Sequence, residues 1–125
     1  MPMTTSFAQT VANAAVGNVS FTAAANTYAA LYSTVLTAAG SGTEITGNGY
    51  SRQSVSYSIA NGIATSTANV SFTSSGNAWP TVKSLAILDA SSGGNMLFYQ
   101  PIASRNVLAG DTLTFATGDI QIIIT

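Results

Sequence analysis

The sequence has no cysteine and no histidine, and only three basic and four acidic side chains among its 125 residues. Without cysteine there is no disulfide, no thiolate metal site and no cysteine nucleophile. Without histidine the chain also lacks the commonest general base and the commonest metal ligand. An enzyme built on this chain would depend on carboxylates, so we expect no catalytic, cofactor-binding or metal-binding residues and no enzymatic activity.

The shortage of charge also excludes two classes of partner. Three basic residues cannot neutralise a run of phosphates, and the sequence pI is near 4.7, so we expect no nucleic-acid partner. The N-terminus has no Lys or Arg of the kind that begins a signal peptide, and no apolar run approaches the roughly 18 residues needed to span a bilayer. We therefore expect neither secretion nor a membrane partner.

The formal net charge is only -1, so copies of the chain repel one another very little. Small soluble domains usually carry about a quarter or more of their surface as charged residues, and a nearly neutral surface favours association. The composition therefore predicts a homo-oligomeric subunit. The alternative is a monomer kept soluble by its hydroxyl and amide side chains.

The N-terminal residues have the periodicity of a short helix. Phe7, Val11 and an alanine at 14 or 15 recur at spacings of three or four residues, which places them on one helical face. A threonine at 4 or 5 can cap its start, and Gly17 can end it. We expect a short helical arm over residues 1–17, followed by the β-sandwich domain over 18–125.

After residue 18, Ser, Thr, Val, Tyr and Ile dominate, and Gly or Asn interrupts at short intervals. This pattern is typical of strands joined by turns. The expected strands are 19–22, 28–35, 50–59, 66–73, 82–89, 96–102, 111–116 and 120–125. Eight short strands predict an all-β fold, a single-domain antiparallel β-sandwich or jelly-roll.

Several strands and connections have features of their own. Residues 85–88 are continuously apolar, which indicates a central strand covered on both faces. Gly93 and Gly94 predict a tight hairpin, and Gly118 with Asp119 predicts a second one between the last two strands. We expect residues 36–48 to form an exposed loop, and the strand at 120–125 to be integral to the sheet.

The carboxylates have structural interpretations. Asp89, Asp111 and Asp119 each lie beside a glycine-containing turn, where an Asp side chain can cap backbone amides. This interpretation is favoured over a glycosidase-like acid pair or a calcium site. Glu44 and Arg52 are eight residues apart, and we expect them to form an ion pair that fixes the long loop to the next strand.

Four apolar or aromatic side chains are candidates for contact with a partner. Trp79 precedes Pro80, where it could be a sugar-binding platform or, as we favour, could close the end of the sandwich with its N–H bonded to a loop carbonyl. Phe7 and Val11 could anchor the chain to a partner or pack on its own sandwich. Tyr50, beside the long loop, is the fourth candidate.

Several segments together resemble a family of short tailed-phage virion structural proteins, described variously as head-decoration or tail-fibre proteins. They are Ala30-Leu31-Tyr32-Ser33, GTEITGNGYSRQ at 42–53, Trp79 with Val82, LAILDASSGGNMLF at 85–98, and AGDTLTFATGDIQIII at 109–124. The resemblance covers nearly the whole chain after Tyr28.

The resemblance implies a virion component, assembled in many copies in the host cytoplasm. We expect a capsid decoration or cement protein that binds the major capsid protein, because a compact domain with a short arm and no fibrous repeat is suited to bridging capsid subunits. The alternative is a tail or tail-fibre component with a receptor- or carbohydrate-binding role. Trp79, Tyr50 and the loop 36–48 are the candidate contacts for that role.

Overall fold

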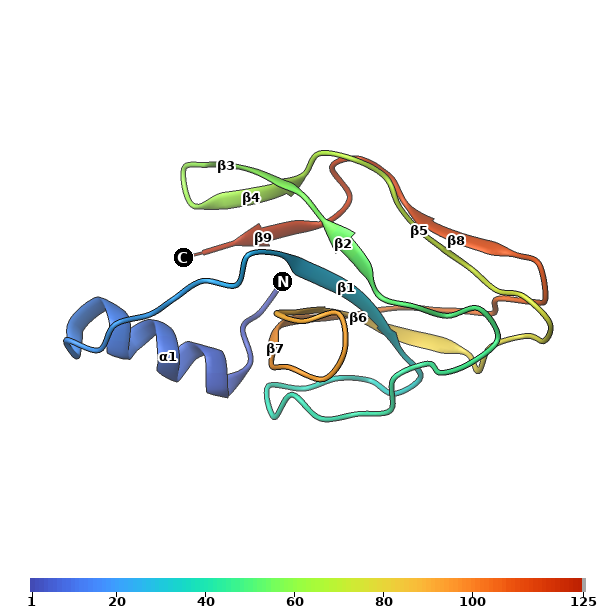
Figure 1. Ribbon diagram of the computed structural model, residues 1–125, viewed down its shortest axis with the longest axis horizontal. Coiled ribbons are helices and arrows are strands. Elements are labelled where there is room, and N and C mark those ends of the chain that lie inside the picture. The colour runs from blue at the N-terminus through green and yellow to red at the C-terminus, as the bar shows by residue number, and fades with distance from the viewer. Residues whose placement is uncertain (125) are drawn as a thin grey trace.

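The computed structural model describes residues 1–124 and shows one short helix followed by antiparallel β-sheet (Figure 1). The elements are α1 (Thr5–Val16), β1 (Thr27–Tyr32), β2 (Gln53–Val55), β3 (Tyr57–Ala60), β4 (Ile63–Ser66), β5 (Val70–Thr73), β6 (Val82–Leu88), β7 (Met96–Arg105), β8 (Thr112–Phe115) and β9 (Gln121–Ile123). They confirm the predicted all-β, single-domain class. The division into an arm, 1–17, and a β domain, 18–125, stays a prediction.

The strands form one four-stranded sheet, in the order β2-β1-β6-β7, and a second layer made from β3-β4-β9 and β5-β8. Buried side chains from the two layers meet in one core, with Leu31 and Ile87 from the first and Phe72, Leu113 and Ile122 from the second. Burying each such side chain contributes about 1.5–3 kcal/mol before conformational entropy is subtracted. As predicted, the apolar residues 85–88 lie in a central strand, because β6 runs between β1 and β7.

Helix α1 begins and ends at predicted residues. The Thr4 hydroxyl accepts a 3.2 Å hydrogen bond from the Phe7 N–H and donates a 2.7 Å bond to the Met96 carbonyl. At the other end, the Gly17 N–H donates to the Asn13 carbonyl at 3.0 Å. No residue of α1 is fully buried, so the helix lies on the outside of the sandwich.

The prediction of one strand over 50–59 was wrong. The chain is extended there, but β2 pairs with β1 in the first sheet while β3 pairs with β4 in the second, and Ser56 alone separates them. The Ser56 carbonyl accepts a hydrogen bond from the Thr67 N–H at 3.0 Å. The chain passes from one sheet to the other here and closes this side of the sandwich. Because it stays extended as it does so, the alternating pattern of the sequence does not reveal where β2 ends and β3 begins.

The predicted strand 66–73 was also wrong at its start. Residues 63–66 form β4 and only 70–73 form β5, so a hairpin between β3 and β4 was missed. Asn61 and Gly62 form its turn, with φ of 53° and 75°. Asn-Gly favours this two-residue turn because both positions require positive φ. The turn residues were therefore visible in the sequence.

Gly118 and Asp119 do not connect a hairpin, contrary to prediction. β8 pairs with β5 and β9 pairs with β4, so the last two strands have different partners and do not pair with each other. The Gly118 N–H donates to the Ser66 carbonyl at 3.0 Å, which holds this turn against the end of β4. The Gly93–Gly94 turn, by contrast, joins the paired strands β6 and β7 as predicted.

Residues 19–22 were predicted to be a strand but form none. β-propensity gives a strand only where a neighbouring strand supplies hydrogen bonds, and this exposed segment has no paired strand within residues 1–124. The expectation of an exposed loop at 36–48 was wrong in part. Leu36 and Ile45 are buried, because the loop returns along β1 and the Ile45 N–H donates to the Leu31 carbonyl at 3.0 Å.

The C-terminal strand is integral to the sheet, as predicted. β9 pairs with β4 over three residues, and Ile120 and Ile122 are buried. The prediction included Thr125, which lies outside the described residues. Ile124 lines a groove together with Ile87 and Phe98 of the first sheet.

Candidate functional site

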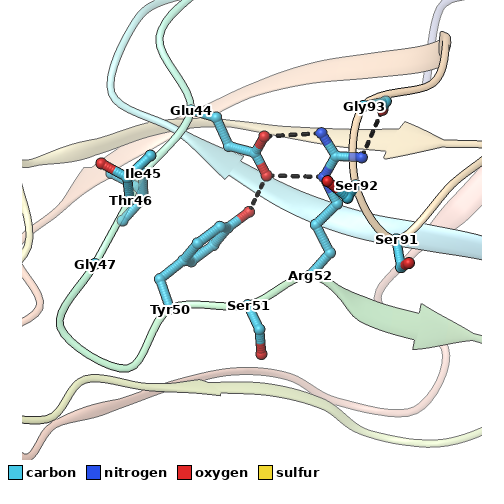
Figure 2. Close-up of a pocket in the computed structure, with 10 residues that line it drawn as sticks. All are labelled: Glu44, Ile45, Thr46, Gly47, Tyr50, Ser51, Arg52, Ser91, Ser92 and Gly93. Carbon is cyan, nitrogen blue, oxygen red and sulfur yellow. Dashed lines mark hydrogen bonds and ion pairs between the residues drawn. The ribbon is translucent and has the colours of Figure 1, made fainter.

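The most connected polar cluster lies where the loop after β1 meets the chain entering β2. Glu44 is in the returning loop, and Tyr50 and Arg52 precede β2, so the three side chains converge (Figure 2). The serine- and glycine-rich turn between β6 and β7 lies beside Arg52. A depression of about 350 Å³ borders the cluster.

Arg52 and Glu44 form a two-point ion pair. Arg52 Nε is 2.9 Å from Glu44 Oε2, and Arg52 Nη2 is 2.8 Å from Glu44 Oε1. The remaining Nη1 donates to the backbone carbonyls of Ala90 and Gly93, both at 2.8 Å. This planar fork of donors is specific to arginine, so the side chain joins two separate loops.

Tyr50 extends the same network into the first sheet. Its hydroxyl donates to Glu44 Oε2 at 2.6 Å and accepts the Leu31 N–H at 3.0 Å. We call Glu44, Tyr50, Arg52 and the carbonyls of Ala90 and Gly93 the Arg52 clamp. The sequence predicted the Glu44–Arg52 pair and the turn at Gly93 and Gly94, but not the contact between Arg52 and that turn, which lies far away along the chain.

The electrostatics of the clamp favour fixed protonation states. Partial burial alone would raise the pKa of Glu44, but hydrogen bonds from Arg52 and Tyr50 outweigh it and hold that pKa below its usual range. Burial first, and then the bond to Glu44, raise the pKa of the Tyr50 hydroxyl. Glu44 therefore stays ionised and Tyr50 stays protonated at neutral pH.

This arrangement is suited to holding loops and not to proton transfer. An ionised Glu44 that already accepts hydrogen bonds from Arg52 and Tyr50 is a poor general acid, and the Arg52 donors are directed at Glu44 and two carbonyls. Within residues 1–124 no three acidic residues gather into a group that could hold a metal ion. The clamp positions loops around the depression.

The three aspartates cap turns. Asp89 accepts the Asn95 N–H at 2.7 Å, Asp111 accepts the Leu108 N–H at 3.3 Å, and Asp119 accepts the Ala116 N–H at 3.0 Å. Each carboxylate thereby satisfies a backbone donor in its own connection.

Trp79 is buried and joined to the clamp. Its side chain is only 5% exposed, and its indole N–H donates to the Asn48 carbonyl at 2.9 Å. The rings of Trp79 and Tyr50 meet edge to face with centroids 5.6 Å apart. The Trp79 ring is therefore not presented to solvent as a sugar-stacking surface would be.

Phe7 and Val11 lie on the helix, away from the clamp. The Phe7 ring packs edge to face against Phe98, with centroids 5.3 Å apart, and also contacts Phe21. Val11 is partly exposed. Of the two interpretations given above for Phe7, packing on its own sandwich is the arrangement in this structure.

One known protein family matches nearly the whole chain. A family model described as "Podophage GP4 fiber I protein gp80" matches residues 2–123. The chain belongs to this podophage fibre family. No curated protein matched the sequence. Membership in the podophage fibre family shows a structural component of a phage virion, as the resemblance implied.

The family match supports one of the two virion locations considered above more than the other. It favours the tail-fibre alternative over capsid decoration or cement, which receives no support from the match.

Within residues 1–124, no helix of the protein has the length and apolar character to cross a membrane.

Proposed function

We propose that this protein is a non-enzymatic structural subunit of a podophage tail fibre. The observation that carries the proposal is the match to the podophage fibre family over residues 2–123. The hydrogen bonds of the Arg52 clamp also support a structural role, because its polar groups hold loops together.

The proposal does not extend to glycan recognition. Of the candidate aromatic contacts, Trp79 is buried and Tyr50 uses its hydroxyl in the clamp. The loop 36–48 places Leu36 and Ile45 in the core, so its larger apolar side chains are not offered to a ligand. The internal roles of these residues support a rigid structural subunit. We further expect this subunit to contact other virion proteins and copies of itself.

The experiment is to locate the protein in virions of the phage that encodes it. Antibody labelling followed by electron microscopy should place the protein on the tail, and tail-less heads should lack it. A label spread over the head, with copies retained by tail-less heads, would overturn the fibre proposal. That outcome would support binding to the major capsid protein instead.

The non-enzymatic part has its own test. Purified protein should show no turnover in a screen against host surface polysaccharides and peptides. Saturable hydrolysis that is abolished by Glu44→Gln or Asp111→Asn would contradict it.

A further inference from the structure

The second layer has an apolar inner face that the first sheet covers only in part. The strand register places Ile59 opposite Ala64, and Ala64 opposite Ile122, so the three side chains form one row across β3, β4 and β9. Ile122 is 5% exposed, whereas Ile59 is 75% exposed. Ile124, two residues beyond Ile122 and on the same face, is 49% exposed.

A groove of about 280 Å³ opens at this place. Ile59, Ile122 and Ile124 line it from the second layer, and Ile87 and Phe98 line it from the first. Ile87 and Phe98 belong to the main core, so the groove leads from solvent to the interior of the sandwich. We call the surface formed by Ile59, Ala64, Ile122 and Ile124 the open apolar end.

No charged residue lies on β3, β4 or β9, although the chain has three basic and four acidic side chains elsewhere. A partner that recognises charge therefore finds nothing to pair with on these strands. β9 pairs with β4, and its Gln121 carbonyl also accepts a 3.4 Å hydrogen bond from the N-terminal ammonium of Met1. Its own sequence, Gln-Ile-Ile, contributes no charged side chain and no proline.

We propose that the open apolar end docks against the same surface of a second copy of this chain. An uncharged apolar surface is compatible with itself, and a two-fold contact brings identical surfaces together. A formal net charge of -1 means that two copies approach with little repulsion. The contact would cover Ile59 and Ile124 and complete the core. The inference concerns the isolated chain and does not depend on the fibre assignment.

Sedimentation velocity of the purified full chain over a range of concentrations tests this contact. The wild type should form dimers, because a two-fold contact between identical surfaces closes at two copies. Ile59→Lys should raise the dissociation constant about tenfold or more, because it places a charge where an isoleucine side chain would be buried. Leu108→Lys is the matched control, since Leu108 is also an exposed aliphatic residue, at 60%, in the connection between β7 and β8. That variant should associate like the wild type.

Ile124→Lys provides an independent second variant in case Ile59→Lys does not fold, which the fluorescence of the single tryptophan and the thermal midpoint will show. It should weaken association in the same direction. A wild type that stays monomeric up to its solubility limit would overturn the proposal. So would an oligomer that both lysine substitutions leave unchanged, or that Leu108→Lys disrupts equally.

Discussion

The guanidinium of Arg52 donates a 2.8 Å hydrogen bond to the backbone carbonyl of Gly93, although the two residues are 41 positions apart. The same guanidinium holds the Glu44 carboxylate on its other side. One side chain thus fixes the loop after β1 and the turn between β6 and β7 relative to each other. The stability of both connections should depend on it.

Replacing Arg52 should therefore destabilise the fold. Arg52→Met leaves the partly buried Glu44 carboxylate without its cation and the carbonyls of Ala90 and Gly93 without a donor. We expect a loss of about 1–3 kcal/mol in the free energy of unfolding, measured by urea denaturation. Arg105→Met is the control, because Arg105 is exposed at the end of β7, and it should change stability by less than about 0.5 kcal/mol. Equal losses of stability in Arg52→Met and Arg105→Met would show that the clamp contacts add nothing to the free energy of unfolding.

Stability should fall in acid because of Glu44. Its pKa is held below its usual range in the folded protein, so its contribution is fully present above the pKa of the unfolded chain, about 4.3, and is lost as the pH falls through the folded value. Urea midpoints measured between neutral and strongly acidic pH should decrease in that window. Hydrogen bonds from Asn95 outweigh partial desolvation and also lower the pKa of Asp89, which adds a loss of the same sign.

Glu44→Gln separates the two carboxylates. This variant should be less stable than the wild type at neutral pH and should lose less stability on acidification. A pH profile that keeps the wild-type slope would assign the acid sensitivity to other groups.

The two glycines of the β6–β7 turn should differ in their tolerance of a side chain. Both have positive φ, 63° at Gly93 and 74° at Gly94. A Cβ at Gly93 would meet nothing within 4 Å, whereas a Cβ at Gly94 would lie 2.7 Å from the Cβ of Ala90. Gly93→Ala should cost about 1 kcal/mol for the backbone conformation, and Gly94→Ala should cost more because the clash is added. Thermal midpoints of the two variants provide the measurement, and the reverse order would contradict the turn geometry.

The single tryptophan gives a direct optical test of the core. Folded protein should show the blue-shifted emission and weak acrylamide quenching of a buried indole. Trp79→Phe should cost about 1–3 kcal/mol, since it leaves the Asn48 carbonyl without its donor and replaces a well-packed ring with a smaller one. Emission typical of a solvent-exposed tryptophan in the folded protein would contradict this packing and reopen the sugar-platform interpretation.

Local patterns identified the elements whose cause is local. Thr4 and Gly17 bound the helix because capping depends on neighbouring backbone groups, and Gly93 with Gly94 marks a hairpin because their φ values are needed there. The continuous apolar run at 85–88 identified the central strand, since a strand covered on both faces has no polar side. The composition also showed the low net charge, which is one of the observations that support the proposed contact between copies.

The pairing of distant strands was decided only in three dimensions. The sequence by itself determined an all-β chain with one capped helix, because propensity, capping and turn chemistry act over a few residues. It did not determine that residues 50–59 divide between two sheets, that β8 pairs with β5 while β9 pairs with β4, or that Arg52 reaches Gly93. Those outcomes depend on how the two layers close over a common core, and a strand with one alternating pattern can join either layer until its neighbours are in place.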